Sequence, residues 1–531
     1  MTASPPPARG TDSPQGGRIA LVPLDERPAC AVLPRMIAAV AGIRVETPPA
    51  ALLPRIRRPG DPEGIARWLT TETANADAAV VCLETLGYGG LIASRTVPAT
   101  TGVVVRRWAS MTTLAEAGVP VHAVTLITRT PDSADAMEEP GYWDPHGPAL
   151  HRLSADLHRA SEQGTAVPAN PPLPPEVLAD FLTRRLRNHT LNLAALDLVA
   201  GGVLRSLVIG ADDTAPYGLA TAELRWLDGW VEWLGLRGSV AVRPGADEAG
   251  STLVARAAGR LLGPDSTPVR VAVEAVDPAG LEAVAPYENV PVGVTARRQV
   301  EACGALPVPA GEPADLRLLV HTPYGADDWA VAPPAAPAAD AVARAQALAE
   351  RAASLLDTAT AVAVADCAQP NGADPVLVRA LTERNLTHRL HGYAGWNTAG
   401  NTLGSVAAHA VTAVAARRAG RFDREAHQRL LLHRFLEDWG YMTRARGTAR
   451  RLLGSDPTRH DTVPDGHPVL ETIAAELDDC RAQLPGFDSL AIVRGSVRLP
   501  WNRTFEADFA LTGDAGTQRL RSAGPGAWEL S

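Results

Sequence analysis

Two stretches of this sequence carry side chains suited to binding or cleaving a polyhydroxylated ligand. The first is 391–404, which reads His-Gly-Tyr-Ala-Gly-Trp-Asn-Thr-Ala-Gly-Asn-Thr-Leu-Gly. Its two aromatic residues, Tyr393 and Trp396, offer flat apolar faces with polar rims, and Asn397 and Asn401 offer paired donors and acceptors. Its glycines allow tight turns and close approach of the backbone to a ligand. We therefore expect this stretch to bind a sugar-like molecule; the alternative is a glycine-rich turn that holds a core tryptophan.

The second stretch is the pair Asp212-Asp213, which follows an apolar run and precedes Tyr217. Two neighbouring carboxylates in a dry pocket cannot both ionise cheaply, so one of them would keep its proton. That group could act as a general acid, and the other could orient a substrate N–H or stabilise positive charge. The pair therefore predicts the acid/base chemistry of glycoside hydrolysis, with two solvated loop aspartates as the alternative.

Further polar residues follow other apolar runs of the chain, at the positions where α/β enzymes carry their chemistry. An aspartate there can also simply cap the next helix, which is our alternative for Asp247 and Asp374. The remaining candidates for substrate binding are Asp25, Arg27, Tyr88, Arg95, Arg129, His321, Asp366 and Asn371.

Short apolar runs separated by helical stretches must position these side chains. The runs are continuous rather than alternating, which is typical of parallel strands covered on both faces. Repeated strand–helix units predict an α/β fold, either a (β/α)8-like barrel or, as the alternative, doubly wound parallel sheets. The predicted strands are 18–24, 78–84, 121–128, 205–210, 239–243, 269–276, 316–321 and 360–366.

The sequence divides into three predicted parts. Residues 1–17 are rich in proline, glycine, serine and threonine and are expected to form a disordered leader. Residues 18–404 are expected to form the α/β catalytic domain, with a helical insertion at about 140–200. Residues 405–531 are expected to form a helical C-terminal region with a small β-hairpin over 489–511.

Composition excludes several classes of function. The net charge of −9 and the lack of a basic stripe argue against nucleic acid as a partner. All 50 basic residues are arginines, which excludes Schiff-base chemistry, pyridoxal phosphate attachment and a Walker P-loop. No strand is followed by a complete Gly-x-Gly-x-x-Gly pattern, so we expect no dinucleotide, and we predict no cofactor and no bound metal.

The cysteines and the longest apolar runs indicate the cellular compartment in which the protein is expected. The 5 cysteines lie far apart, without zinc-type spacing, and are expected to be small buried residues in a reducing compartment. No apolar run approaches the ~18 residues that a membrane span needs. We therefore expect a cytoplasmic protein without a membrane partner, and the sequence does not indicate an oligomeric state.

Several motifs together resemble a bacterial family known as domain of unknown function 4127. The resemblance covers nearly all of the chain after the leader, and the family name implies no activity. The motifs that carry it are Pro23–Pro28, Leu86–Leu91 with Ser94-Arg95, Gly210–Asp213 with Tyr217-Gly218, Gly245–Glu248, Asn371–Asp374, Tyr393–Thr398 and Pro500–Glu506.

The paired aspartates also resemble those of barrel β-N-acetylglucosaminidases that use substrate assistance. This resemblance implies that Asp212 polarises an acetamido N–H and that Asp213 protonates the leaving oxygen. Trp396 and Asn397 would then line the sugar subsite. The likeness is one dipeptide on an expected architecture, so it bears on chemistry only by analogy.

These observations favour a glycoside hydrolase-like enzyme that acts on a small carbohydrate-like substrate. One alternative is a metal-dependent hydrolase with Asp25, Asp212, Asp366 and His321 as ligands. It is the weaker hypothesis because the sequence has no His-x-His or His-Glu-x-x-His spacing. The other alternative is a non-catalytic sugar-binding protein.

Overall fold

The computed structural model describes most of the chain. The described ranges are 16–73, 75–166, 173–263, 267–324, 339–456, 461–512, 520–522 and 528–530. The expected disordered leader, 1–17, lies outside the described residues except for its last two positions. Within the described ranges, no helix is both long and apolar enough to cross a membrane.

All eight predicted strands are present, and they belong to two separate parallel sheets. The first sheet has the order β2-β1-β3-β4-β5-β6, and the second has the order β11-β10-β9-β7-β8. A short antiparallel pair, β12-β13, follows near the end of the chain. The strands are β1 Arg18–Val22, β2 Arg44–Glu46, β3 Ala78–Cys82, β4 Val121–Ile127, β5 Ser206–Ala211, β6 Val240–Pro244, β7 Arg270–Glu274, β8 Leu306–Val308, β9 Leu316–His321, β10 Ala361–Asp366, β11 Gly392–Ala394, β12 Leu520–Ser522 and β13 Trp528–Leu530.

The two parallel sheets repeat one strand order. In each, the first strand lies between the second and the third, and the later strands continue outward on the side of the third. This is a doubly wound order, in which ligands bind beyond the carboxyl ends of the strands where the winding direction reverses. Those points lie between β1 and β3 in the first sheet and between β7 and β9 in the second.

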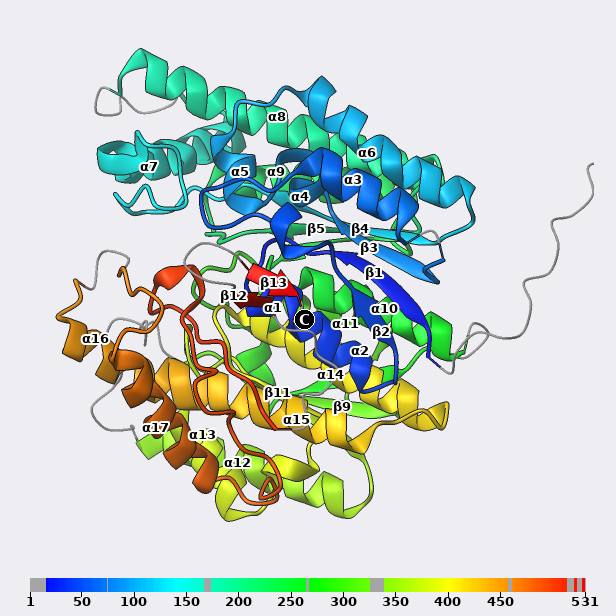
Figure 1. Cartoon of the computed structure of the whole chain (residues 1–531), viewed down its shortest axis with the longest axis vertical. Helices are drawn as coiled ribbons and strands as arrows, with labels where there is room; N and C mark the ends of the chain where they lie inside the picture. The colour runs from blue at the N-terminus through cyan, green and yellow to red at the C-terminus, as the bar shows by residue number, and fades with distance from the viewer. Residues whose placement is uncertain are drawn as a thin grey trace, which may run out of the picture.

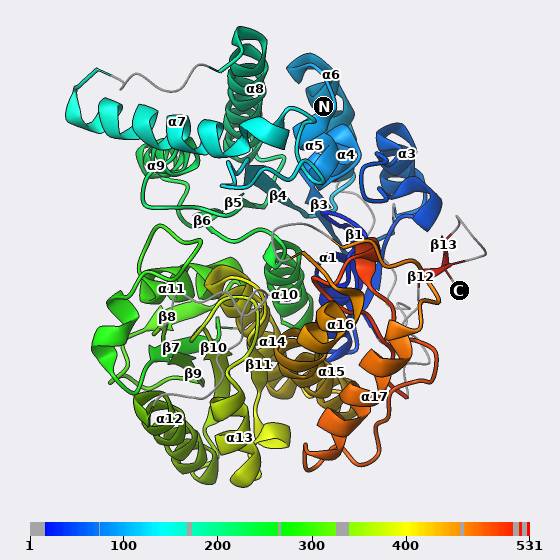
Figure 2. The same ribbon diagram turned by 90° about the vertical axis from the view of Figure 1, so that its left-hand side faces the viewer.

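Helices cover both faces of each sheet, and the layers are stacked as Figures 1 and 2 show. Helices α3, α4, α6, α8 and α9 lie on the outer face of the first sheet, and α12 and α13 lie on the outer face of the second. Helices α2 and α10 pack between the sheets against α11 and α14. The α-helices are α1 Pro28–Ala31, α2 Leu33–Ala39, α3 Pro62–Thr71, α4 Leu83–Tyr88, α5 Leu91–Thr96, α6 Thr101–Glu116, α7 Trp143–Gln163, α8 Pro175–Ala200, α9 Leu219–Trp233, α10 Ala249–Leu262, α11 Val292–Ala302, α12 Ala339–Asp357, α13 Pro375–Glu383, α14 Ala399–Arg418, α15 Arg424–Phe435, α16 Arg446–Leu453 and α17 Val469–Ala482. Shorter helical segments are η1 Ala50–Leu52, η2 Pro278–Glu282, η3 Thr387–Arg389, the π-helix η4 Leu436–Ala445 and η5 Pro500–Asn502.

Burial on both faces explains why the strands read as continuous apolar runs. In β1, Ile19 and Leu21 belong to the cluster that packs on α10, whereas Ala20 and Val22 belong to the cluster beneath α6 and α8. The same division holds in β10, where Val362 faces α12 and α13 and the next residue faces α14. Both sets of side chains are buried away from water in the folded protein, so neither face can tolerate polar residues.

The (β/α)8-like barrel was the wrong choice between the two predicted architectures, because the described strands form two open sheets. A ladder joins β5 to β6, but none joins β6 to β7. The chain instead crosses through α10, which packs on α14 and separates the two sheets. The doubly wound alternative therefore fits the structure.

The other predicted parts of the chain fold as follows. Helix α8, within the expected insertion, packs on β4 and β5 and serves as the crossover between them, whereas α7 is an addition. The boundary expected at 404 falls inside α14. The helical C-terminal region is present, and the 489–511 segment is closed by two isolated antiparallel bridges rather than by continuous strands. All 5 cysteines are buried and free, as expected.

Candidate functional site

A buried ionic cluster occupies the carboxyl ends of β1 and β6. The Arg27 guanidinium donates from Nη2 to Asp25 Oδ2 at 2.7 Å and to Asp247 Oδ1 at 2.6 Å. All three side chains are almost fully buried, so each charge depends on its partners to offset the loss of water. Burial raises the pKa of Asp247 to about 6, and Asp25 contributes to that rise although Arg27 opposes it. The expected roles of Asp25 and Arg27 in substrate binding are untested, but their first partners are each other.

A second cluster connects the carboxyl ends of β4 and β5. Arg129 donates from Nη1 to Asp213 Oδ2 at 2.8 Å and from Nη2 to Glu138 Oε2 at 3.0 Å. Arg95 pairs with Asp212 and, at 3.2 Å, with Glu139. Each aspartate of the pair therefore has its own arginine, although the charge of Asp212 still helps to raise the pKa of Asp213. Burial alone would raise the pKa of Glu138, but Arg129, Arg503 and Arg95 outweigh it and hold that pKa well below its usual range.

The motif Pro500–Glu506 joins these two clusters. The guanidiniums of Arg27 and Arg503 each lie over the Trp501 ring, 4.5 Å from its centre, and Trp501 Nε1 donates to Glu26 at 2.8 Å. Arg503 pairs with Glu138, and Glu506 lies 3.8 Å from Arg27. Trp501 adopts a φ of 56°, a strained conformation for a bulky residue that its many contacts must hold in place. The C-terminal segment is thus part of the site, which its place in the sequence did not indicate.

A cavity of about 960 Å³ lies beside the second cluster. Its wall comes from loops beyond β4 and β5 of the first sheet and beyond β7 and β9 of the second. The cavity therefore opens where the carboxyl ends of the two sheets meet. It lies next to the position between strands β7 and β9 at which the second sheet reverses its winding. The residues that matter for chemistry in this wall are Asp132, His151, Asp213, Tyr217, Tyr287, Glu288 and Tyr324.

Glu288 is the most distinctive residue of the cavity. Its side chain is only 3% exposed, and its Oε1 accepts a hydrogen bond from Gly400 N, in the first turn of α14, at 2.7 Å. Its Oε2 has no hydrogen-bond partner among the described residues. Burial raises the pKa of Glu288 to about 8, the Gly400 bond opposes this rise, and Glu248 and Asp213 add to it. Glu288 therefore carries a proton at neutral pH and can donate it.

Asp213 and Tyr217 are the predicted site residues that line this cavity. The Asp213 side chain is about a third exposed, with 32% of its surface open. Burial and the neighbouring Asp212 raise its pKa, and Arg129 opposes that rise by pairing with the ionised form. Asp212 and Arg129 lie behind Asp213, and Arg95 lies behind Asp212.

His321 and Asp366 lie behind the cavity wall at the ends of β9 and β10. The hydroxyl of Tyr324, a wall residue, donates to Asp374 Oδ2 at 2.7 Å, and His321 Nε2 lies 2.9 Å from the same oxygen. Asp374 N donates to Asp366 Oδ2 at 2.7 Å, and Asp374 also caps α13, as expected. Burial raises the pKa of Asp366 to about 7, while His321 lowers it. This network supports Tyr324 from beneath.

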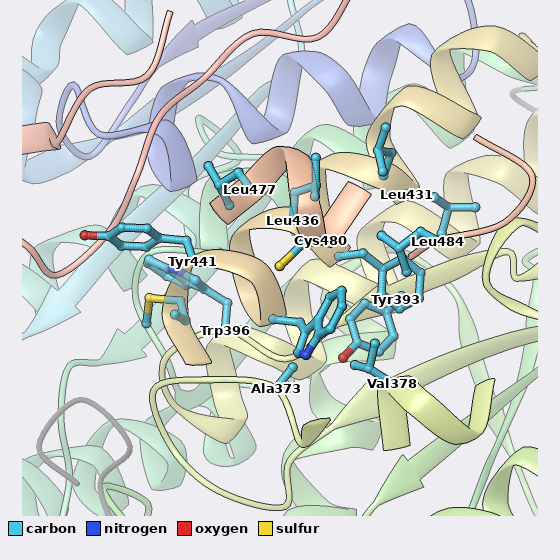
Figure 3. Close-up of a cluster of buried hydrophobic side chains, with 14 of the residues drawn as sticks. Ala373, Val378, Tyr393, Trp396, Leu431, Leu436, Tyr441, Leu477, Cys480 and Leu484 are labelled. Carbon is cyan, nitrogen blue, oxygen red and sulfur yellow. The ribbon is translucent and has the colours of Figure 1, made fainter. Parts of the chain in front are cut away.

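The aromatic residues of 391–404 do not reach the cavity. Figure 3 shows Tyr393 and Trp396 among the buried apolar side chains of the C-terminal helices. The Tyr393 ring is fully buried and stacks on Phe435 with centroids 4.0 Å apart, and Trp396 packs edge-on against Phe505. The alternative of a glycine-rich turn with a core tryptophan therefore describes this stretch better than a sugar-binding loop.

The remaining predicted residues also serve the framework. Tyr88 is buried in the first sheet's core with Arg187 4.8 Å over its ring. Asn371 and Asn397 adopt left-handed φ values of 61° and 58°, and Asn371 N donates to Asn397 O at 2.8 Å. Asn401 is buried in the first turn of α14. These roles explain the residue types, because asparagine tolerates positive φ better than most side chains.

Replacing Trp396 by phenylalanine tests its place in the core. Trp396 Nε1 has no hydrogen-bond partner among the described residues, so the change leaves no polar group stranded. We expect the free energy of unfolding to fall by about 1–2 kcal/mol from lost packing, with ligand binding unchanged. The matched control is Trp226→Phe, because Trp226 is 66% exposed and its replacement should be neutral. Lost ligand binding at full stability would contradict the core role.

The structure does not bring the four expected metal ligands together. Asp25 is held by Arg27, Asp212 by Arg95, and the pair Asp366 and His321 belongs to the other sheet. Within the described residues, a group with ligand atoms no more than 4.8 Å apart is Asp25, Cys30 and Asp247. Arg27 already donates to both of its carboxylates, so this group does not fit a cation.

These features define an α/β protein of two doubly wound parallel sheets with a carboxyl-lined cavity at their shared edge. The family described as protein of unknown function, DUF4127, matches residues 19–510, and the chain belongs to it. No curated protein and no solved structure matches the chain. The resemblance drawn from the sequence motifs is thus confirmed, whereas the likeness to barrel β-N-acetylglucosaminidases has no support.

The sequence motifs did not point to Glu288 or to the pair Glu138-Glu139 as residues of the site. Glu288 follows β7 only after η2 and a further loop, so it does not stand at a strand end in the sequence. Glu138 and Glu139 lie in the loop between β4 and α7. A signal was present in Pro286-Tyr287-Glu288-Asn289, a turn that carries an acid beside an aromatic residue, but similar turns are common on protein surfaces.

Proposed function

We propose that this protein is a glycoside hydrolase-like enzyme that acts on a small carbohydrate or glycoconjugate. The observation that carries the proposal is a cavity with two carboxyl side chains, of which Glu288 is buried without an arginine partner among the described residues and Asp213 is partly exposed and paired with Arg129. Burial keeps Glu288 protonated at neutral pH, whereas Asp213 is paired with Arg129. Glycoside hydrolysis requires such a division between a proton donor and an anion.

The roles of the two groups follow from their surroundings. Glu288 donates its proton to the glycosidic oxygen as the bond to the anomeric carbon breaks. Asp213 stabilises the positive charge that develops on the sugar, and Arg129 holds its carboxylate in place. Water then adds to the anomeric carbon and returns a proton to the ionised Glu288, which completes the hydrolysis. This assignment changes the one made from the sequence, in which Asp213 was the acid and Asp212 its partner. Asp212 now serves to position Asp213 through the shared ionic cluster.

The cavity also suits a sugar in size and lining. Its volume of about 960 Å³ lies near the upper end for small-molecule sites, which leaves room for more than one ring. Tyr217 and Tyr287 are 38% and 43% exposed, so their rings are open to stack on apolar sugar faces. Thr130, Ser133 and Thr214 supply hydroxyl groups in the same wall.

The direct test is hydrolysis of a panel of 4-nitrophenyl glycosides by the full-length protein. We expect release of nitrophenol from at least one glycoside, with a rate that falls as Glu288 loses its proton above about pH 8. Sugar binding without turnover across the panel would instead support the non-catalytic alternative. Turnover that a chelator abolishes and a divalent cation restores would support the metal-dependent alternative.

Replacing Asp213 by asparagine should reduce turnover about 100-fold without unfolding the protein. Asparagine keeps the shape of the side chain and tolerates the φ of 39° at this position. Arg129 keeps Glu138 and Glu139 as partners, so the unfolding free energy should change by less than about 1 kcal/mol. Turnover and thermal midpoint are measured together, with Asp228→Asn, far along α9, as the control. A large loss of stability would mark Asp213 as structural.

A further inference from the structure

Acidic side chains outnumber basic ones in the wall of the cavity. The wall contains three carboxyl side chains, Asp132, Asp213 and Glu288, and no arginine lines it among the described residues. In a chain whose basic residues are all arginines, an acidic ligand would need guanidiniums in this wall. Glu288 is protonated and adds no charge, so the negative charge of the wall comes from Asp132 and Asp213, and such a wall attracts cations and repels anions.

Three arginines that pair with or lie over residues of the cavity wall are engaged by carboxylates. Arg129 pairs with Asp213 at 2.8 Å and also with Glu138 and Glu139. Arg159 lies over the Tyr217 ring and pairs with Asp156 at 3.3 Å. Arg344 lies over the Tyr324 ring and pairs with Asp340 at 3.5 Å. None of these three offers an uncompensated positive charge to a ligand.

Two carboxyl oxygens of this wall have no hydrogen-bond partner among the described residues. Glu288 Oε2 is buried and has no hydrogen-bond partner in the described chain, although its residue is only 3% exposed. Asp213 uses Oδ2 for Arg129, and its Oδ1 accepts no hydrogen bond from any described residue. A buried polar atom without a partner is costly, so a ligand that supplies donors would relieve that cost.

We propose that the substrate of this cavity carries a protonated amine, as a 2-amino sugar does, and that Asp213 and Asp132 receive this ammonium group. This inference rests on the proposed function for the reaction but concerns recognition alone. The ammonium donates to Asp213 Oδ1, and Asp132 at the exposed rim adds attraction. Glu288, which stays protonated, then faces the glycosidic oxygen rather than the amine. Uronic acids and sugar phosphates are repelled.

Binding to the full-length protein is measured by isothermal titration calorimetry at pH 7, without any requirement for turnover. The probes are glucosamine, glucose, glucuronate and the linear diamine putrescine. We expect glucosamine to bind at least about 10-fold more tightly than glucose, because one added ion pair with a partly buried carboxylate is worth about 1.4 kcal/mol or more. We expect glucuronate to bind more weakly than glucose.

Two variants assign the preference to the cavity. Asp132→Asn should reduce the glucosamine preference a few-fold, and Asp213→Asn should remove most of it. Glu282→Gln is the matched control, because Glu282 is exposed in η2 and lies outside the cavity wall. The advantage of glucosamine should also fall as salt is raised from 50 to 500 mM, whereas binding of glucose should not.

Equal binding of glucosamine and glucose, or tighter binding of glucuronate, would overturn the inference. Putrescine binding as tightly as glucosamine would also overturn it, because the site would then recognise an amine without a sugar. Glucosamine binding without hydrolysis of any amino glycoside would sink the proposed function and leave this inference standing. Hydrolysis of neutral glycosides alone, with no preference for glucosamine, would support the proposed function and overturn this inference.

Discussion

Replacing Glu288 by glutamine is expected to lower turnover by about 10³- to 10⁴-fold, near the upper end of what a general acid contributes. Glutamine has the shape of glutamic acid, and its amide oxygen can still accept the bond from Gly400 N at the start of α14. The amide cannot give up a proton to a leaving group. The loss should therefore appear in kcat, while the affinity for an unreactive sugar stays within a few-fold of the wild type.

The same substitution has a distinct effect on stability, and its sign follows from the raised pKa. The pKa of Glu288 rises from 4.5 in the unfolded chain to about 8 in the folded protein. Below pH 4.5 both states hold the proton, and as the pH rises toward 8 only the unfolded state releases it. The wild type therefore loses stability across this range, by roughly 5 kcal/mol at most, since each pKa unit corresponds to about 1.4 kcal/mol.

Glutamine does not ionise, so the Glu288→Gln variant should lack this loss. We expect urea denaturation to show a variant close to the wild type at pH 5 and more stable than it at pH 9. Glu282→Gln, an exposed neighbour in η2, should follow the wild type at both values. A variant with full turnover would remove Glu288 from the chemistry. A variant that loses turnover but shows no relative gain in stability at pH 9 would mean that the pKa of Glu288 is not raised in the folded protein.

Replacing Arg27 by methionine should be the most destabilising single change at the carboxyl edge of the first sheet. Arg27 is 4% exposed, and it pairs with Asp25 and Asp247. Removing one partner of a buried ion pair leaves an uncompensated charge and costs about 3–5 kcal/mol. Here two carboxylates lose their cation, and Trp501 loses one of the two guanidiniums that lie over its ring.

The defect should depend on pH, because protonation relieves the stranded carboxylates. Without Arg27, which now opposes the rise, the pKa of Asp247 increases above its value of about 6, so the variant loses stability as the pH rises and the unpaired carboxylates ionise. We expect urea denaturation to show that the variant loses more unfolding free energy, relative to the wild type, at pH 8 than at pH 5. Arg27→Met combined with Asp247→Asn should recover part of the loss, because one of the unpaired charges is gone.

Arg106→Met is the control for this experiment, since Arg106 is exposed on α6 and should matter by less than about 0.5 kcal/mol. If Arg27→Met lowers the free energy of unfolding by less than about 1 kcal/mol, the buried cluster is not needed to stabilise the edge of the first sheet. A deficit that is the same at pH 5 and pH 8 would assign the effect to lost packing of Arg27 rather than to charge.

The two clusters and the cavity form one continuous edge of the molecule. Arg27 connects to Trp501 and Glu506, Arg503 connects to Glu138, and Glu138 connects through Arg129 to Asp213. A change near β1 can therefore alter the Asp213 carboxylate that lines the cavity. The sequence placed Asp25, Arg129 and Asp213 at strand ends, and the structure confirms that they lie at the carboxyl ends of one sheet.

The sequence by itself determined the class of fold and the edge on which polar groups gather. Continuous apolar runs require burial on both faces, so strands such as 121–128 and 316–321 could be placed within a residue or so of β4 and β9. Strand ends then located Asp212 and Asp213, since polar residues interrupt an apolar run only where it meets solvent or a site. The family motifs were equally local and needed no coordinates.

Only the tertiary structure decided between a barrel and two sheets, because strand order depends on pairing between distant segments. The repeat of one strand order in both sheets leaves no repeat in the sequence. The burial of Tyr393 and Trp396 likewise depends on Phe435 and Phe505, which lie far along the chain. The raised pKa of Glu288 comes from its burial beside Gly400, 112 positions away, and no pattern of neighbouring residues encodes that environment.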